Sequence, residues 1–87
     1  MMPRRQVETS SYIAFARRII RGAGKRVASA DDWELAELVS LRDEVDDAIR
    51  RAVQGLRAQG HSWTYIGDAL GIRRQSAQER YGKDAAA

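Results

Sequence analysis

Polar side chains that can pair with the edges of nucleic-acid bases gather near the C-terminal end of the chain. Arg74 and Gln75 are adjacent, and Gln78 follows about one helical turn later. A guanidinium group has the donor geometry for the guanine edge, and a carboxamide matches the adenine edge. Cationic and hydroxyl side chains nearby can contact phosphates. The candidates for phosphate contact are Arg73, Arg80, Lys83, Thr64 and Ser62.

The chain offers little for catalysis or for metal binding. It has no cysteine, and His61 is its single histidine, so neither a thiolate site nor an ordinary zinc site is expected. It contains no Gly-rich phosphate cradle and no nucleophile elbow. A run of acidic residues would face around a helix instead of converging on one point: Asp43, Glu44, Asp46 and Asp47. We therefore expect a non-enzymatic protein without a cofactor or a metal ion.

The stretch over 62–82 must position the candidate side chains, and it begins with a predicted short helix. Ser62 is a good N-cap, because its hydroxyl can accept from an unpaired N–H group of the first turn. Apolar residues at spacings of three and four predict one buried stripe: Trp63, Ile66 and Leu70. Trp63 could instead join Tyr65 in a stacking platform for single strands. Its place on the apolar stripe favours the core.

Two glycines predict how a second helix follows the first. Gly67 has no side chain, so the second helix can cross closely there. Gly71 can adopt the positive φ that ends a helix and starts a sharp turn. We expect Tyr81 to pack back on the preceding long helix and Gly82 to end the second helix, with a mobile tail over 83–87.

This stretch contains Ser62, Trp63, Ile66, Gly67, Ala69, Leu70, Gly71, Ile72, Arg74, Gln75, Ser76, Ala77, Arg80, Tyr81 and Gly82. With these residues at these positions, it resembles the helix-turn-helix of small actinobacterial and actinophage DNA-binding proteins. Gly67 stands where alanine is usual, and Arg73 stands where a Ser or Thr cap is usual. The resemblance implies a helix-turn-helix fold and binding to double-stranded DNA.

A long central helix is predicted over 31–59, ahead of the motif. Its apolar residues keep helical spacing from Leu38 to Leu56, and Gly55 within it suggests a close contact. About 29 residues at 1.5 Å each give a rod of roughly 43 Å, which is longer than the motif can cover. We therefore expect a homodimer through this helix. The alternative is a break near Ser40 in a compact monomer.

The N-terminal region predicts a basic amphipathic helix over 10–23. Its apolar stripe, from Tyr12 to Ala23, is expected to face the core, and Gly22 and Gly24 are expected to end it. Residues 1–9 are predicted to form a disordered basic arm. Arg4 and Arg5 could contact a minor groove or phosphates from this arm, or the segment could simply be a frayed terminus.

Charge is distributed unevenly along the 87 residues. The net charge is +3, but residues 1–26 sum to +6, residues 27–56 to −5 and residues 57–87 to +2. Basic ends around an acidic middle suit a polyanionic partner. The length predicts one domain, here all-α over 10–82. No apolar run has the length of a membrane span and no signal-peptide pattern opens the chain, so we expect a cytoplasmic protein without a membrane partner.

Together these patterns predict a sequence-specific protein that binds double-stranded DNA. Its second motif helix, over 73–81, would enter the major groove, and a transcriptional regulator is the expected role. The alternative is a protein-interaction module with the same helix-turn-helix fold, similar to a phage or antitoxin adaptor, that does not bind DNA.

Overall fold

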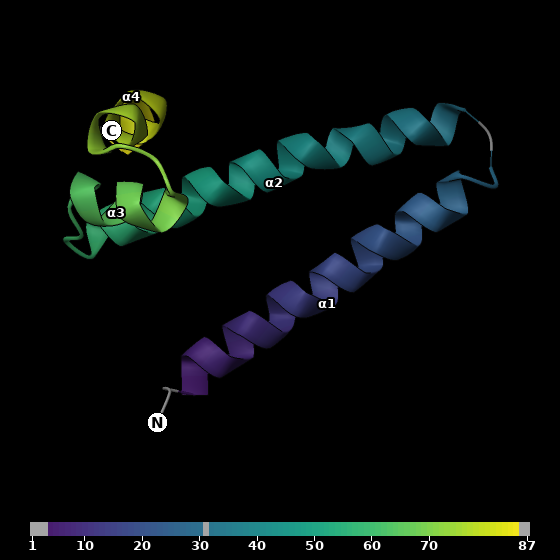
Figure 1. The fold of residues 1–87 in the computed structure, drawn as a ribbon, viewed down its shortest axis with the longest axis horizontal. Coiled ribbons are helices and arrows are strands. Elements are labelled where there is room, and N and C mark those ends of the chain that lie inside the picture. Colours follow the sequence, from purple (N-terminus) through teal and green to yellow (C-terminus); the bar gives the residue numbers. More distant parts are fainter. Residues whose placement is uncertain (1–3, 31, 86–87) are drawn as a thin grey trace. The chain divides into compact units, whose positions relative to one another are not determined.

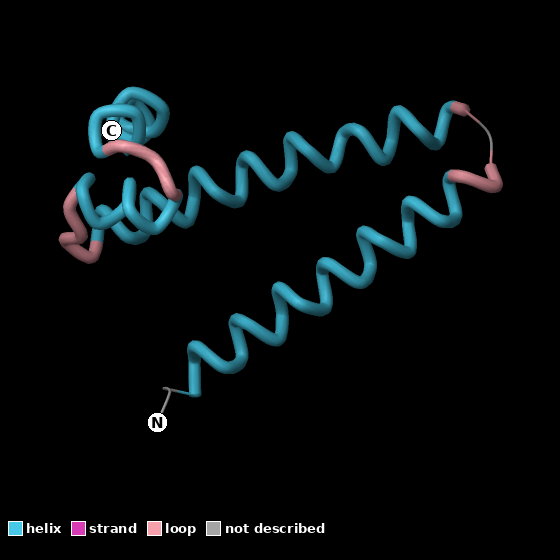
Figure 2. The backbone as a smooth tube through the Cα atoms, viewed as in Figure 1, coloured by secondary structure: helices cyan, strands magenta, loops and turns pink. Residues whose placement is uncertain are grey.

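In the structure, a computed structural model, the described residues form helices joined by turns. It describes residues 4–30 and 32–85, and side chains over 8–30 and 32–83. Four helices follow one another in these ranges: α1 (Arg4–Val27), α2 (Trp33–Ala58), α3 (Trp63–Leu70) and α4 (Arg74–Ala85) (Figure 1). Turns join them (Figure 2). The predicted all-α class is therefore confirmed for the described residues. None of these helices combines the length and the apolar character needed to cross a membrane.

Helix α1 is longer at both ends than the sequence predicts. It begins at Arg4, so residues 4–9 are helical and not a disordered arm, while residues 1–3 lie outside the described residues. It also runs through Gly22 and Gly24 to Val27, and neither glycine has a positive φ. A glycine inside a helix costs only about 1 kcal/mol relative to alanine. The alanine, lysine and arginine residues around these two glycines favour helix enough to continue it.

Helix α2 is continuous over 26 residues, close to the predicted 31–59, although Asp31 lies outside the described residues. There is no break near Ser40, whose hydroxyl donates to the carbonyl oxygen of Glu37 one turn earlier. A serine whose hydroxyl donates to a backbone carbonyl of the preceding turn can lie inside a helix. The prediction of a close contact at Gly55 is wrong, because a Cβ at this position would meet nothing within 4 Å.

A glycine turn ends α2 and sets the start of α3. Gly60 has a φ of 93°. Its N–H donates to the carbonyl of Arg57 at 2.9 Å, and the N–H of His61 donates to the carbonyl of Leu56 at 3.1 Å. These two bonds form a Schellman motif, which satisfies carbonyls that the helix end leaves unpaired. The chain therefore leaves α2 in a defined direction and enters α3 two residues later.

The described chain divides into two compact units whose boundary lies within α2. The N-terminal unit is Met1–Leu41 and the C-terminal unit is Arg42–Ala87. The single domain expected over 10–82 stays a prediction.

The buried core lies in the C-terminal unit. Val53 of α2, Ile66 of α3 and Ala77 of α4 are 3%, 1% and 0% exposed. Partly buried side chains surround them: Ile49, Leu56, Trp63, Ile72 and Tyr81. Each of the three helical segments in this unit therefore contributes one buried apolar side chain. The packing of Tyr81 against the cluster that includes Val53 agrees with the expected contact to the long helix.

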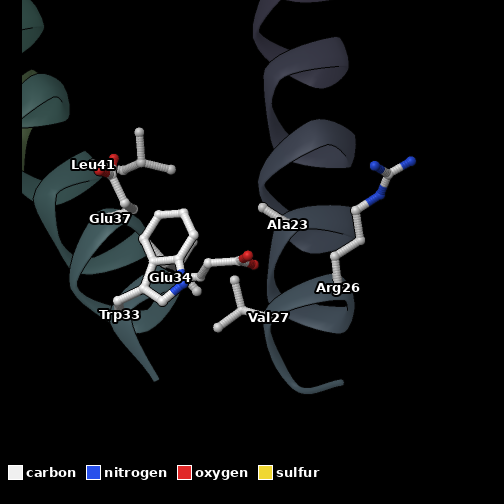
Figure 3. A pocket seen from close by; sticks show the side chains of 8 residues that line it. Ala23, Arg26, Val27, Trp33, Glu34, Glu37 and Leu41 are labelled. Atoms are coloured by element: carbon white, nitrogen blue, oxygen red, sulfur yellow. The ribbon is translucent and has the colours of Figure 1, made fainter. Parts of the chain in front are cut away.

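The N-terminal unit leaves most of α1 open, which corrects the expectation that its apolar stripe faces the core. Every residue from Glu8 to Arg21 is exposed. Partial burial begins only in the last turns, where Ala23 and Val27 point toward the start of α2 and line a pocket with Trp33 (Figure 3). The described part of this unit holds no third segment that could cover the stripe.

Candidate nucleic-acid interface

The turn between α3 and α4 has the geometry that the glycines predict. Gly71 adopts φ 73° and ψ 27°, a left-handed conformation. Its N–H donates to the carbonyl of Asp68 at 3.2 Å, and the N–H of Ile72 donates to the carbonyl of Gly67 at 2.9 Å. This is a second Schellman motif. It redirects the chain within three residues, and α4 begins at Arg74.

Gly67 allows the turn to approach the first helix closely. A Cβ at this position would lie 2.9 Å from the carbonyl oxygen of Ile72 and 3.1 Å from the backbone nitrogen of Arg74. Both are backbone atoms, so neither can move aside as a flexible side chain would. The absence of a side chain at Gly67 therefore matches a turn that packs closely against α3.

The start of α3 is fixed by the predicted cap. Ser62 has extended backbone angles, and its hydroxyl oxygen accepts from the N–H of Tyr65 at 3.1 Å. The predicted apolar stripe is buried unevenly. Ile66 is enclosed, Trp63 is half-buried, and Leu70 at the end of the helix is 36% exposed.

Helix α4 turns a narrow apolar side toward the core. Ala77 is fully buried and Tyr81 is half-buried one turn later. Gly82 does not end the helix as predicted. It lies beside Trp63, with a hypothetical Cβ 3.9 Å from the indole, and α4 continues to Ala85. The expected mobile tail is therefore helical over 83–85, and residues 86–87 lie outside the described residues.

The three candidate base-contacting residues are all exposed on α4. Arg74 opens the helix, Gln75 follows it, and Gln78 lies one turn further on. Gln75 is held by a neighbour, because its Nε2 donates to Oε1 of Glu79 at 3.3 Å. The guanidinium of Arg74 and the two carboxamides are thus available at the surface of one helix.

The candidate phosphate contacts are exposed in the same unit. Ser62 and Thr64 lie at the N-terminal end of α3, where the helix dipole favours an anion. Arg73 lies in the turn, and Arg80 and Lys83 lie on α4. All eight candidate residues of 62–83 therefore share the C-terminal unit.

The two N-terminal candidates are separate from this group. Arg4 and Arg5 begin α1 in the N-terminal unit, and their side chains lie outside the described residues. Their expected contacts with DNA stay a prediction.

Arg57 joins α2 to α3, a role that the sequence does not predict. The guanidinium carbon of Arg57 lies 4.8 Å from the centroid of the Trp63 ring, and its Nη1 donates to the carbonyl oxygen of His61 at 3.0 Å. His61 in turn stacks on Tyr65, with ring centroids 4.3 Å apart. A cation–π contact of this kind contributes about 0.5–2 kcal/mol. No spacing rule predicts it, because the chain reverses between Arg57 and Trp63.

No family model, no curated protein and no solved structure matches the chain.

Proposed function

We propose that the chain is a non-enzymatic, sequence-specific protein that binds double-stranded DNA and regulates transcription in the cytoplasm. In this proposal α3 and α4 form a helix-turn-helix of the type found in small actinobacterial and actinophage proteins. Helix α4 enters the major groove, while α3 crosses the backbone beside it.

The observation that carries the proposal is the bend at Gly71 combined with the two sides of α4. Ala77 is fully buried against the core, yet Arg74, Gln75 and Gln78 remain exposed near the start of the same helix. A recognition helix needs this combination, because its N-terminal residues must reach base edges while its other side anchors it. If Arg74 and Gln75 were covered by α2, the proposal would have no basis.

The surrounding charges support the same surface. Arg73, Arg80 and Lys83 are exposed close to the candidate base contacts. Ser62 and Thr64 add hydroxyl groups at the start of α3. Contacts with phosphates position a protein on the duplex, and contacts with base edges select the sequence. Both kinds of donor are present within residues 62–83.

Selection of bound duplexes from a random library tests the proposal directly. We expect a defined sequence to emerge, and Arg74→Ala to lose about 1–3 kcal/mol of discrimination at one base pair. Gln75→Ala should do the same at a neighbouring pair. Arg51→Ala and Gln54→Ala, at exposed positions of α2, are matched controls and should change neither affinity nor preference.

Two results would contradict the proposal. Equal losses on every duplex sequence would exclude direct contacts to bases by Arg74 and Gln75. Failure to bind any duplex at low salt would exclude DNA as the partner. The second result, together with a tight protein partner in a pull-down, would favour the alternative of a protein-interaction module, to which the acidic charge of α2 is suited.

A further inference from the structure

Large apolar side chains are exposed along two helices outside the candidate DNA-binding surface. Of the twelve such side chains among the described residues, ten lie between Tyr12 and Val45. On α1 they are Tyr12, Ile13, Phe15, Ile19 and Ile20, and on α2 they are Trp33, Leu35, Val39, Leu41 and Val45. Tyr12 is 75% exposed and Trp33 is 62% exposed. A soluble chain rarely leaves a contiguous apolar patch of this extent open to water.

The apolar face of α1 is wide and continuous. At 100° per residue, the apolar residues from Tyr12 to Ala23, except Ala14, occupy an arc of about 160° around the helix, and no charged residue of 12–23 falls within it. An amphipathic surface helix needs an apolar stripe only slightly wider than about 100°. An arc of this width is typical of a helix that contacts two neighbours, as in a four-helix bundle.

The open face of α2 continues the stripe that is already buried in the C-terminal unit. Ile49, Val53 and Leu56 pack in the core with α3 and α4. Leu41 and Val45 precede them at helical spacing but are 36% and 46% exposed. Helices α3 and α4 do not cover this part of α2, although its apolar pattern continues there. A second surface is needed to cover the first half of this helix.

The charges of the two helices are complementary. Residues 12–26 of α1 carry five basic side chains and no acidic one. Residues 33–47 of α2 carry six acidic side chains and only Arg42 as a basic one. Two copies of α1 placed side by side would repel each other, whereas α1 beside α2 of a second copy would bring opposite charges together along the edges of the apolar contact.

The exposed area is what a stable dimer requires. Aromatic side chains present about 150–250 Å² and aliphatic ones about 60–120 Å², so ten half-exposed side chains amount to roughly 600 Å² per copy. Homodimer interfaces are about 65% apolar, which corresponds to roughly 900 Å² per copy. A standard interface buries about 800 Å² per partner.

We propose that these two faces form the interface of a homodimer, in which α1 of each copy packs against the first half of α2 of the other. The dimer is a helical bundle formed by α1 and α2 of both copies. This inference is independent of DNA binding, so each of the two proposals can fail without the other.

The test is the molar mass of the full chain in solution, measured by sedimentation equilibrium between about 1 and 100 µM. We expect about twice the 9.8 kDa of one chain. Ile19→Glu, which faces the acidic α2 of the partner, and Val39→Lys, which faces the basic α1, should each weaken association at least tenfold. Ser10→Glu and Gln54→Lys add the same charges at exposed positions outside the apolar faces and should leave the dimer intact.

A variant that loses helical structure would also lose the dimer, so a second measurement uses the wild-type chain alone. The unfolding temperature of the wild-type dimer should rise with chain concentration, because association stabilises the folded state. A single-chain mass with concentration-independent unfolding would overturn the proposal, as would a dimer that both variants leave unchanged. A monomer that binds vesicles of phosphatidylcholine and phosphatidylserine would overturn it and assign the faces to a membrane surface instead.

Discussion

Gly67 and Gly55 both lie inside helices, but their surroundings differ. A Cβ at residue 67 would meet the backbone of Ile72 and Arg74 within about 3 Å, whereas a Cβ at residue 55 would project into open space. In the first case the missing side chain makes room for the turn that places α4. At residue 55 the missing side chain makes room for nothing, and the glycine only lowers the helix propensity of α2.

Substitution of these two glycines should therefore have opposite effects. Gly67→Ala should lower the free energy of unfolding by about 1–3 kcal/mol, because the added methyl group forces the backbone of the turn outward. Gly55→Ala should raise it by about 1 kcal/mol. Urea unfolding followed by circular dichroism measures both. A neutral or stabilising Gly67→Ala would show that the turn does not need this close approach.

If Gln75 contacts a base as proposed, we expect Glu79 to position it. Because one hydrogen of the Gln75 Nε2 is bonded to Oε1 of Glu79, the second N–H and the carbonyl oxygen of the carboxamide are left for another partner. These are the donor and the acceptor that pair with N7 and N6 of adenine. We therefore expect the carboxylate to hold the carboxamide in an orientation that suits an adenine.

Glu79→Ala should accordingly reduce the preference for adenine at the base that Gln75 contacts. The expected loss is about 0.5–1.5 kcal/mol, the net contribution of one hydrogen bond. Glu79→Gln keeps an acceptor oxygen and should retain most of the preference. Competition binding between duplexes that differ at this base measures the effect, and a uniform change in affinity on both duplexes would rule out the positioning role.

At the scale of elements, α3 depends on its two ends. A helix of eight residues is not stable in water by itself, so its cap, its turn and its burial must hold it together. Ser62 satisfies one N–H at the start, Gly71 closes the end, and Ile66 anchors the middle. Arg57 adds a contact across the junction with α2. These features orient α3, and through the turn they orient α4.

Two substitutions at Ser62 separate its role in folding from its role in binding. Ser62→Ala should lower the free energy of unfolding by about 1 kcal/mol through loss of the cap. Ser62→Asp preserves the cap and should keep stability near the wild type, but its negative charge should weaken binding to duplex DNA. Thermal unfolding and binding titrations provide the two measurements. An unchanged affinity for Ser62→Asp would remove Ser62 from the phosphate contacts.

At the scale of the whole molecule, charge and apolar surface are segregated along the chain. The basic candidate contacts of 73–83 lie in the C-terminal unit, the acidic residues lie on α2, and the open apolar faces lie on α1 and the first half of α2. Under the two proposals, one part of the chain meets a polyanion while another part associates with a second copy. We then expect the acidic segment to disfavour non-specific contact of α2 with DNA.

Binding to duplex DNA should weaken steeply with salt. If Arg73, Arg80 and Lys83 each neutralise one phosphate, the slope of log affinity against log salt is about −3 for one C-terminal unit and about −5 for two. Lys83→Ala should reduce the slope by about 1 for each unit that binds. Fluorescence anisotropy between about 50 and 200 mM salt measures it, and a flat dependence would mean that these charges do not contact phosphates.

The sequence by itself determined the features that depend on neighbouring residues. The Ser62 cap, the left-handed turn at Gly71 and the burial of Ile66 all follow from spacing and backbone preference, and the structure contains each of them. For α2 the spacing left a break near Ser40 open, and the structure shows a continuous helix. The exposure of Arg74 and Gln75 follows as well, because the turn directs Ala77 toward the core. Arg74 and Gln75 then lie on other sides of α4.

Only the tertiary structure decided the features that depend on distant parts of the chain. The sequence predicts a helix end at Gly22, Gly24 and Gly82, yet all three lie inside helices. The contact of Arg57 with Trp63 and the need for glycine at residue 67 arise from the path of the backbone around a turn. The open face of α1 could not be predicted either, because periodicity shows which side of a helix is apolar but not what covers it.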